Sequence, residues 1–164
     1  MQCEKPGCVG VARTTSLDEW DAYFSLRDKS TFRPTSLSCR HYNCIAWAAG
    51  DSKRRWEHQA GYKWPKAPRT EDIESLVAVF AGLGYSKCDD GSLEAGFEKV
   101  VLYVHFLRPR WTHAARQLPN GMWTSKIGHL EDVQHRTPEC LQSGDYGRVH
   151  SYMRRATSPA IEPG

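Results

Sequence analysis

The sequence predicts an α+β fold in which helices of the N-terminal half pack on an antiparallel sheet formed by the C-terminal half. Two observations carry this prediction. Helical periodicity and helix-capping residues occur before residue 85, whereas apolar strand-like runs and a hairpin turn occur after residue 96. We find no internal repeat and no linker. We therefore expect a single domain over residues 1–155, followed by a frayed tail over residues 156–164.

The composition is that of an ordinary globular protein, since 40% of the 164 residues are hydrophobic and 25% are charged. A net charge of +3 does not by itself indicate nucleic acid, and we expect no nucleic-acid partner. The N-terminus lacks an apolar signal region, and no apolar run reaches membrane-spanning length. We therefore expect no membrane partner, and a protein that is cytoplasmic or secreted without a cleaved signal.

Three helices are predicted from apolar residues at helical spacing and from the residues that start and end them. Each helix begins behind a capping side chain, and two of them end at a glycine. The first covers residues 17–27 and starts at the capping box Ser16–Glu19. The second covers residues 44–49, with Asn43 as N-cap and Gly50 at its end. The third covers residues 71–83, with Thr70 as N-cap and Gly84 at its end. Residues 57–69 form an extended connector, and residues 86–96 a polar loop.

The second half contains the predicted strands. Residues 97–106 are apolar on both faces, as in a central strand that is covered on both sides. Residues 112–118 and 122–127 flank Pro119-Asn120-Gly121, which is a strong hairpin signal, and residues 146–154 form a last strand. If Leu118 opposes Met122, the side chains at positions 113, 115, 125 and 127 share one face.

Cys44 is the first candidate for chemistry, because it stands in the first turn of a short buried helix. The N-terminal end of a helix dipole lowers the pKa of a thiol and favours the nucleophilic thiolate. If Cys44 is a nucleophile, the helix N-terminus and an imidazolium together should hold its pKa below about 8.5, the value of a free thiol. The alternative is that Cys44 is an inert packing residue of an apolar segment.

His113 is the candidate base for that thiol, since a cysteine nucleophile is usually activated by an imidazole. It begins a hairpin strand, and its small neighbours Ala114 and Ala115 leave room for another element. The hairpin register places Ser125 diagonal to His113, within hydrogen-bond reach of the ring, where it would orient the imidazole. His105 is the rival base.

Four segments of the chain resemble a bacterial family of unknown function. The segments are Tyr42-Asn43-Cys44-Ile45-Ala46-Trp47-Ala48, Trp64-Pro65, His113-Ala114-Ala115-Arg116-Gln117-Leu118 and Trp123-Thr124-Ser125-Lys126-Ile127-Gly128, and the resemblance extends over most of residues 31–153. The order of a helix-start cysteine, a sheet histidine and a polar residue on the next strand also resembles papain-like hydrolases, in particular the compact NlpC-type and CHAP enzymes.

This resemblance implies a papain-like core and a cysteine hydrolase that cleaves an amide or thioester bond without a cofactor. Cys44 would attack the carbonyl, and His113 would move the proton. The substrate would be peptide-like or a small molecule. The residues expected to surround it are Tyr42, Asn43, Trp47, Trp56, Trp123, Arg116 and Lys126.

Two other functions fit the sequence. In the first, the same domain is a non-catalytic binding module that holds a polar or anionic partner with the cations of residues 53–55 and with tryptophans. In the second, Cys3, Cys8, Cys39 and His41 hold a structural zinc ion, although their spacing is not that of a common zinc ribbon. Because no export signal is seen, we expect the cysteines other than Cys44 to be unpaired. The sequence leaves the oligomeric state open.

Overall fold

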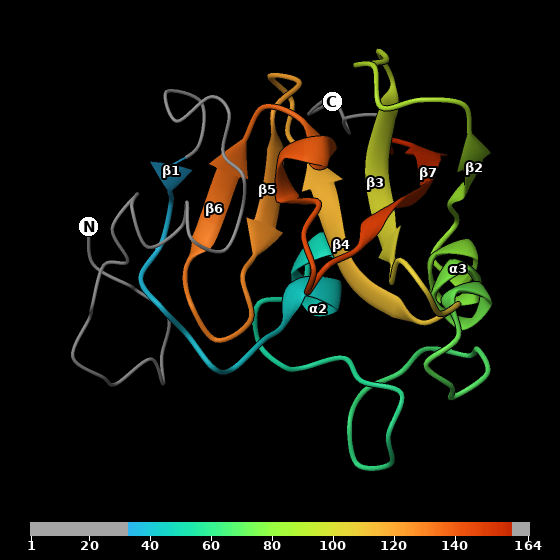
Figure 1. The fold of residues 1–164 in the computed structure, drawn as a ribbon. Coiled ribbons are helices and arrows are strands. Elements are labelled where there is room, and N and C mark those ends of the chain that lie inside the picture. Colours follow the sequence, from blue (N-terminus) through green and yellow to red (C-terminus); the bar gives the residue numbers. More distant parts are fainter. Residues whose placement is uncertain (1–32, 159–164) are drawn as a thin grey trace, which may run out of the picture.

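The computed structural model describes residues 33–158, which form one seven-stranded antiparallel sheet with two short α-helices (Figure 1). The strand order is β1-β6-β5-β4-β3-β7-β2. The strands are β1 (Arg33–Pro34), β2 (Ser86–Cys88), β3 (Phe97–Val104), β4 (Trp111–Gln117), β5 (Trp123–Lys126), β6 (Asp132–His135) and β7 (Arg148–Ala156). The helices are α2 (Cys44–Ala48), α3 (Ile73–Gly82) and the 3-10 helix η2 (Pro138–Leu141).

The prediction of an α+β fold with a papain-like core is wrong, because the sheet dominates the described chain. Its α-helices have only five and ten residues, and the predicted helix over residues 17–27 lies outside the described residues. Three strands come from segments without an apolar pattern. In β6, for example, Asp132 and His135 are buried, and hydrogen bonds to Tyr42 and Ser125 satisfy their polar groups. Because hydrogen bonds satisfy these buried polar groups, polar segments form strands that hydrophobic periodicity does not predict.

Strand β3 lies between two hydrophobic cores, one on each face of the sheet. This agrees with the prediction that residues 97–106 form a central strand covered on both sides. Val100, Leu102 and Val104 point to the face that is covered by α2 and α3. Val101 and Tyr103 point to the opposite face, where η2 lies (Figure 1). The Tyr103 hydroxyl donates a hydrogen bond to the carbonyl of Pro138 at 2.7 Å. The alternation of a strand thus places successive side chains in different cores.

The two helices begin and end at polar residues and glycines, in part as predicted. The side chain of Asn43 accepts a hydrogen bond from the backbone N–H of Ala46, which confirms it as the N-cap of α2. Gly50 follows this helix with a φ of 86°, a conformation that favours glycine. The cap of α3 is Asp72 rather than Thr70.

The β4–β5 hairpin has the predicted register, since Arg116 pairs with Thr124 and Gln117 pairs with Trp123. The N–H of Leu118 also donates to the carbonyl of Met122 at 2.7 Å. Helix α2 packs against both strands of this hairpin. Within residues 33–158, no helix is long and apolar enough to cross a bilayer.

Candidate functional site

Asn43 anchors the start of α2 to the connector that follows the helix. Besides capping the helix, its Oδ1 accepts a hydrogen bond from the N–H of Trp56 at 3.1 Å. Its Nδ2 donates to the carbonyl of Trp56 at 2.8 Å. A two-way hydrogen bond of this kind fixes the side chain, so the first turn of α2, which carries Cys44, has a defined position.

The Cys44 thiol is free and lies against the backbone of Ala114 in β4. Burial of the sulfur raises the pKa of Cys44 to about 11, and the hydrogen bond from the Ala114 backbone offsets only part of this effect. The prediction of a depressed pKa is therefore wrong. The physical reason is that loss of water around a thiolate outweighs the dipole of a five-residue helix.

His113, Ser125 and His135 form a chain of buried hydrogen bonds on the opposite face of the sheet from α2. The His113 Nε2 and Ser125 Oγ atoms are 3.0 Å apart, as the hairpin register predicts. Ser125 Oγ is also 2.8 Å from His135 Nε2, and His135 Nδ1 is 2.9 Å from the carbonyl oxygen of Thr137. The three side chains are fully buried. We call this set the histidine relay.

The direction of each hydrogen bond in the histidine relay follows from the carbonyl of Thr137 at its end. A carbonyl only accepts, so His135 Nδ1 carries the proton that it donates to Thr137. Burial lowers the pKa of His135 to about 4, so the ring is neutral near pH 7 and its Nε2 accepts from the Ser125 hydroxyl. Ser125 in turn accepts from His113 Nε2–H.

This arrangement leaves His113 Nδ1 as a bare acceptor. Burial, with a smaller contribution from His135, lowers the pKa of His113 to about 3, so this ring is neutral too. Among the described residues, no group forms a hydrogen bond with the buried Nδ1 atom. An unpaired acceptor inside a protein is costly and is rare outside functional or strained sites.

Tyr146 connects the relay with the neighbourhood of Cys44. Its ring stacks on the His113 ring with centroids 4.2 Å apart and planes 10° apart. Burial raises the pKa of Tyr146, and the next contribution comes from the nearby Cys44 thiol. Cys44 and His113 therefore share neighbours, Ala114 and Tyr146, although no hydrogen bond between these two side chains is present in the described part of the chain.

Most of the other residues predicted around a substrate have structural roles. The Tyr42 hydroxyl donates to the Asp132 carboxylate at 2.7 Å, and Lys126 lies over the Tyr42 ring. Trp47 donates from Nε1 to Thr124 at 3.0 Å. The remaining tryptophans in that prediction, Trp56 and Trp123, are almost fully buried. Arg116, by contrast, lines a pocket.

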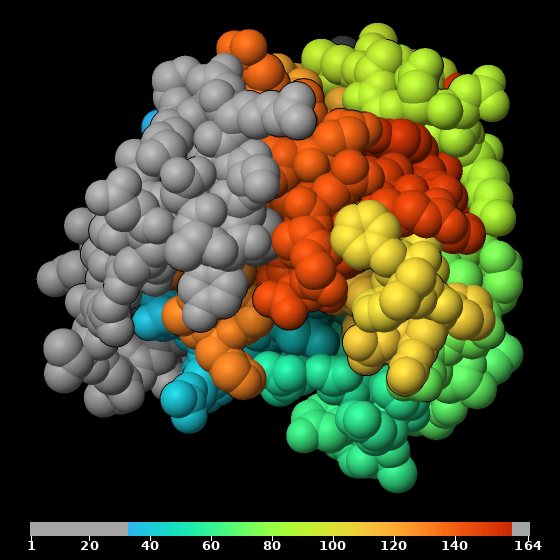
Figure 2. Space-filling model, in the orientation of Figure 1, coloured from blue at the N-terminus to red at the C-terminus, as the bar shows by residue number. Residues whose placement is uncertain are grey.

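A second candidate site is an open cleft with a volume of about 870 Å³, lined mainly by cations. It lies where the chain before α2 meets the connector of residues 51–69, which projects at the lower edge of the face in Figure 2. We call it the basic cleft. Its cationic side chains are Arg40, Lys53, Arg54, Arg55, Lys63 and Arg69, and His41, Tyr62 and Trp64 also line it.

The two carboxylates beside the basic cleft are already engaged. Asp51 accepts hydrogen bonds from Arg54 Nε and from Trp56 Nε1, both at 2.9 Å. Glu57 pairs with Arg55 at 2.9 Å. Within residues 33–158, the side chains of Arg40 and Lys53 form no hydrogen bond or ion pair. Among the described residues, the cleft thus carries positive charge that its neighbouring acids do not neutralise.

The pKa of His129 is lowered in part by the same positive charges. Its Nδ1 atom lies 3.4 Å from a guanidinium nitrogen of Arg55, at the edge of the basic cleft. Burial is the largest cause of its lowered pKa, followed by the charges of Arg55, Arg40 and Lys126. These cations penalise a further positive charge on the ring.

Sequence reasoning missed His135, Tyr146 and much of the basic cleft. His135 lies in a strand without an alternating pattern, so no sequence signal places it beside Ser125. Arg40 and Arg69 are far apart in the sequence, and only the folding of residues 51–69 brings them to one cleft with the predicted cations of residues 53–55. The rival base, His105, lies in the β3–β4 loop, where its Nδ1 accepts from the N–H of Leu107.

Cys39 is disulfide-bonded, which corrects the prediction that it is unpaired. A disulfide sulfur is not a thiolate, so Cys39 does not serve the predicted zinc site. The other cysteines of that prediction, Cys3 and Cys8, lie outside the described residues. Cys88 and Cys140 are free thiols, as predicted. In the part of the chain that the structure describes, no group of three or more His, Cys, Asp or Glu is arranged to hold a metal ion.

Comparisons with known proteins give a family but no activity. No curated protein and no solved structure matches the chain. Nothing in these comparisons supports the resemblance to papain-like enzymes, and with the sheet-dominated fold they remove the basis for classifying the chain as a papain-like hydrolase. Residues 33–154 match the family model described as a domain of unknown function, DUF7689, so this chain belongs to that family.

Proposed function

We propose that the protein binds an anionic partner through the basic cleft. The observation that carries the proposal is that, within residues 33–158, six cationic side chains line the cleft and the two carboxylates beside it are already paired. Folding brings these like charges together from residues 40–69, which costs free energy unless counterions or a ligand compensate it. Arg40 and Lys53, which have no partner within residues 33–158, are available to a ligand without breaking a bond.

The side chains of the cleft favour a partner that bears several phosphate or carboxylate groups. Arginine presents a planar fork that matches the oxygens of such groups, and four of the six cations are arginines. Tyr62, which is 45% exposed, adds an aromatic surface at the rim. Because the cleft is open, the strength of binding should fall as salt screens these charges.

The test is a titration of the full-length protein with tripolyphosphate, followed by NMR and calorimetry. We expect the Arg40→Gln/Lys53→Gln double variant to bind about tenfold more weakly or worse, since each charge-assisted contact contributes about 1 kcal/mol or more. The matched control is Arg108→Gln/Arg110→Gln, which removes two exposed arginines from the β3–β4 loop. Equal affinity of the two double variants, or spectral changes outside the cleft, would refute the proposal.

A second candidate function is nucleophilic chemistry at Cys44, favoured by Tyr146, which lies near Cys44 and stacks on His113, whose Nδ1 atom is unpaired among the described residues. In this function the Cys44 sulfur attacks an amide or thioester carbonyl while a neighbouring imidazole takes the thiol proton. A neutral thiol and a neutral histidine suit transfer of the proton during attack rather than before it.

Labelling of the thiols distinguishes this chemistry from packing. If His113 assists Cys44, hydrogen peroxide should oxidise Cys44 faster than the free thiols Cys88 and Cys140, and His113→Gln should remove that advantage. A small oxidant is used because the Cys44 side chain is only partly exposed. Equal rates at the three thiols, with no effect of His113→Gln, would leave Cys44 as a packing residue.

A further inference from the structure

Arg116 has an exceptional environment at the end of β4. Its guanidinium lies over the ring of Trp47, with Cζ 5.2 Å from the ring centroid. Its Nε atom is buried and has no hydrogen-bond partner, and within residues 33–158 no carboxylate forms an ion pair with the side chain. A half-buried arginine is normally held by an acid or by carbonyl oxygens, because its charge and its five N–H groups need partners.

The acids closest to Arg116 along the wall of the same pocket are committed to other cations. Glu94 pairs with Lys99 at 3.4 Å and also with Arg154. Glu98 pairs with Arg155. These pairs engage the acids of the pocket wall, so that Glu98 and Asp132 act on Arg116 only at longer range and no ion pair holds its guanidinium within residues 33–158.

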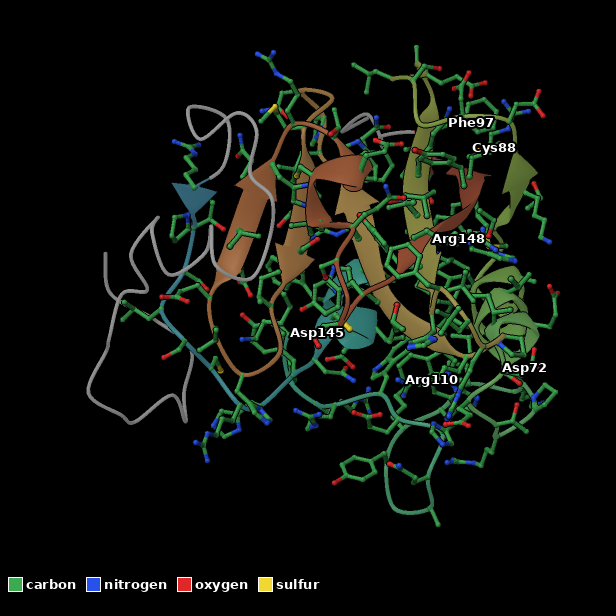
Figure 3. The ribbon with its side chains drawn as sticks, viewed as in Figure 1. Asp72, Cys88, Phe97, Arg110, Asp145 and Arg148 are labelled. Atoms are coloured by element: carbon green, nitrogen blue, oxygen red, sulfur yellow. The ribbon has the colours of Figure 1, made fainter. Side chains whose placement is uncertain are left out.

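The pocket beside Arg116 has a volume of about 570 Å³, within the range of roughly 300–1,000 Å³ that is typical of sites for small ligands. It lies between the start of β3, where Figure 3 labels Phe97, and the end of β4. Its apolar wall is formed by Leu93, Phe97, Leu118 and Pro119, and the Leu93 side chain is 57% exposed. Gln117 is also at the wall, but its amide already donates to the carbonyl of Gly91 at 2.7 Å.

We propose that this pocket binds a small carboxylic acid with an apolar chain or ring. The carboxylate pairs with the Arg116 guanidinium, which lies over the Trp47 ring and presents N–H groups in a planar fork. The apolar part covers Leu93, Phe97 and Leu118. This site is separate from the basic cleft and does not depend on the function proposed there, because the two pockets share no residue.

The experiment compares octanoate with octanamide, which has the same shape and no charge, on the full-length protein by NMR. We expect octanoate to bind about tenfold more tightly, because only the acid forms a charge-assisted pair with Arg116. The spectral changes should be confined to the pocket, at Leu93, Phe97 and Leu118. Equal binding of acid and amide, no binding of either, or changes that map to the basic cleft would overturn the proposal.

Variants test the role of Arg116 itself. Arg116→Met keeps a long side chain over Trp47 and should abolish the preference for octanoate over octanamide. Arg116→Lys keeps the charge without the fork and should retain part of that preference. If Arg116→Met does not fold, the exposed variant Leu93→Asp must lower octanoate binding by placing a negative charge at the wall. An unchanged preference in folded Arg116→Met, or unchanged affinity in Leu93→Asp, excludes this site.

Discussion

The Ser125 hydroxyl lies between two buried imidazoles, 3.0 Å from His113 Nε2 and 2.8 Å from His135 Nε2. Because the hydroxyl both donates and accepts, one atom satisfies a donor on one ring and an acceptor on the other. The relay holds β4, β5 and β6 together through side chains at the edge of the β4–β5 ladder. It therefore contributes to stability, whatever chemistry His113 performs.

Replacement of Ser125 by alanine should destabilise the protein by about 2 kcal/mol or more, because it leaves two buried ring nitrogens without partners. Urea denaturation of the variant and the parent measures this change. Ser92→Ala is the control, since the Ser92 hydroxyl is bonded to an exposed aspartate at 2.6 Å, and we expect a change below about 0.5 kcal/mol there. Similar losses for the two variants would mean that the relay adds nothing.

The two histidines of the relay should make stability depend on pH below neutrality. Their folded pKa values, about 3 for His113 and about 4 for His135, lie below the unfolded value of about 6.5. At pH values between the folded and the unfolded pKa, the unfolded chain therefore binds more protons than the folded protein. The stabilisation is thus complete above about pH 6.5 and is lost as the pH falls towards the folded values. Each histidine contributes a slope of up to about 1.4 kcal/mol per pH unit.

Urea denaturation between about pH 7 and about pH 5 checks this slope, since most carboxylates remain ionised in that range. His113→Gln should reduce the slope, because one of the two buried imidazoles is gone. A free energy of unfolding that stays constant over this range in the parent protein would contradict the prediction.

The relay also shows which part of the site was predictable. The pair His113 and Ser125 followed from the sequence, because the turn at residues 119–121 sets the register and alternation then assigns the faces. His135 did not follow, because β6 consists of polar residues and one valine and pairs with β5 only through the folded sheet. Local patterns specify hairpins, but they do not specify which distant segment completes the sheet.

The fold class failed for a related reason. Asn43 and Gly50 correctly marked the ends of α2, but these signals say nothing of how much sheet surrounds a helix. The segment of residues 86–96 contains β2 at its start, although its polar composition indicates a loop. Such an edge strand is exposed to water, so no apolar residue needs to mark it.

The basic cleft should respond measurably at His129. Removing a nearby cation by Arg40→Gln should raise the pKa of His129, since the positive charge of Arg40 contributes to its lowering. Bound tripolyphosphate should raise this pKa in the parent protein as well. Titration of the imidazole signals by NMR measures both effects, and Arg110→Gln serves as a control that leaves the cleft intact. A His129 pKa that responds to neither change would show that the cleft charges do not act on this ring.

Gly147 follows Tyr146, whose ring stacks on His113, at a close approach of the chain to β3. Its φ is 71°, and a Cβ atom at this position would clash with the carbonyl oxygen of Val104 in β3. Two backbone hydrogen bonds join Gly147 to Ser143, at 2.7 Å and 3.2 Å, so the turn that precedes β7 is closed here. Any side chain therefore pushes this turn away from β3.

Gly147→Ala should destabilise the protein by about 3 kcal/mol or more, since it combines an unfavourable φ with a backbone clash. In the same turn, Gly144→Ala meets no atom within 4 Å and has no positive φ, and it should change the stability by less than about 0.5 kcal/mol. Urea denaturation measures both. Because Tyr146 precedes Gly147, the His113 ring signals should also shift in Gly147→Ala and stay unchanged in Gly144→Ala. If the two variants were equally stable, the close approach of this turn to β3 would not be needed to hold Tyr146 against His113.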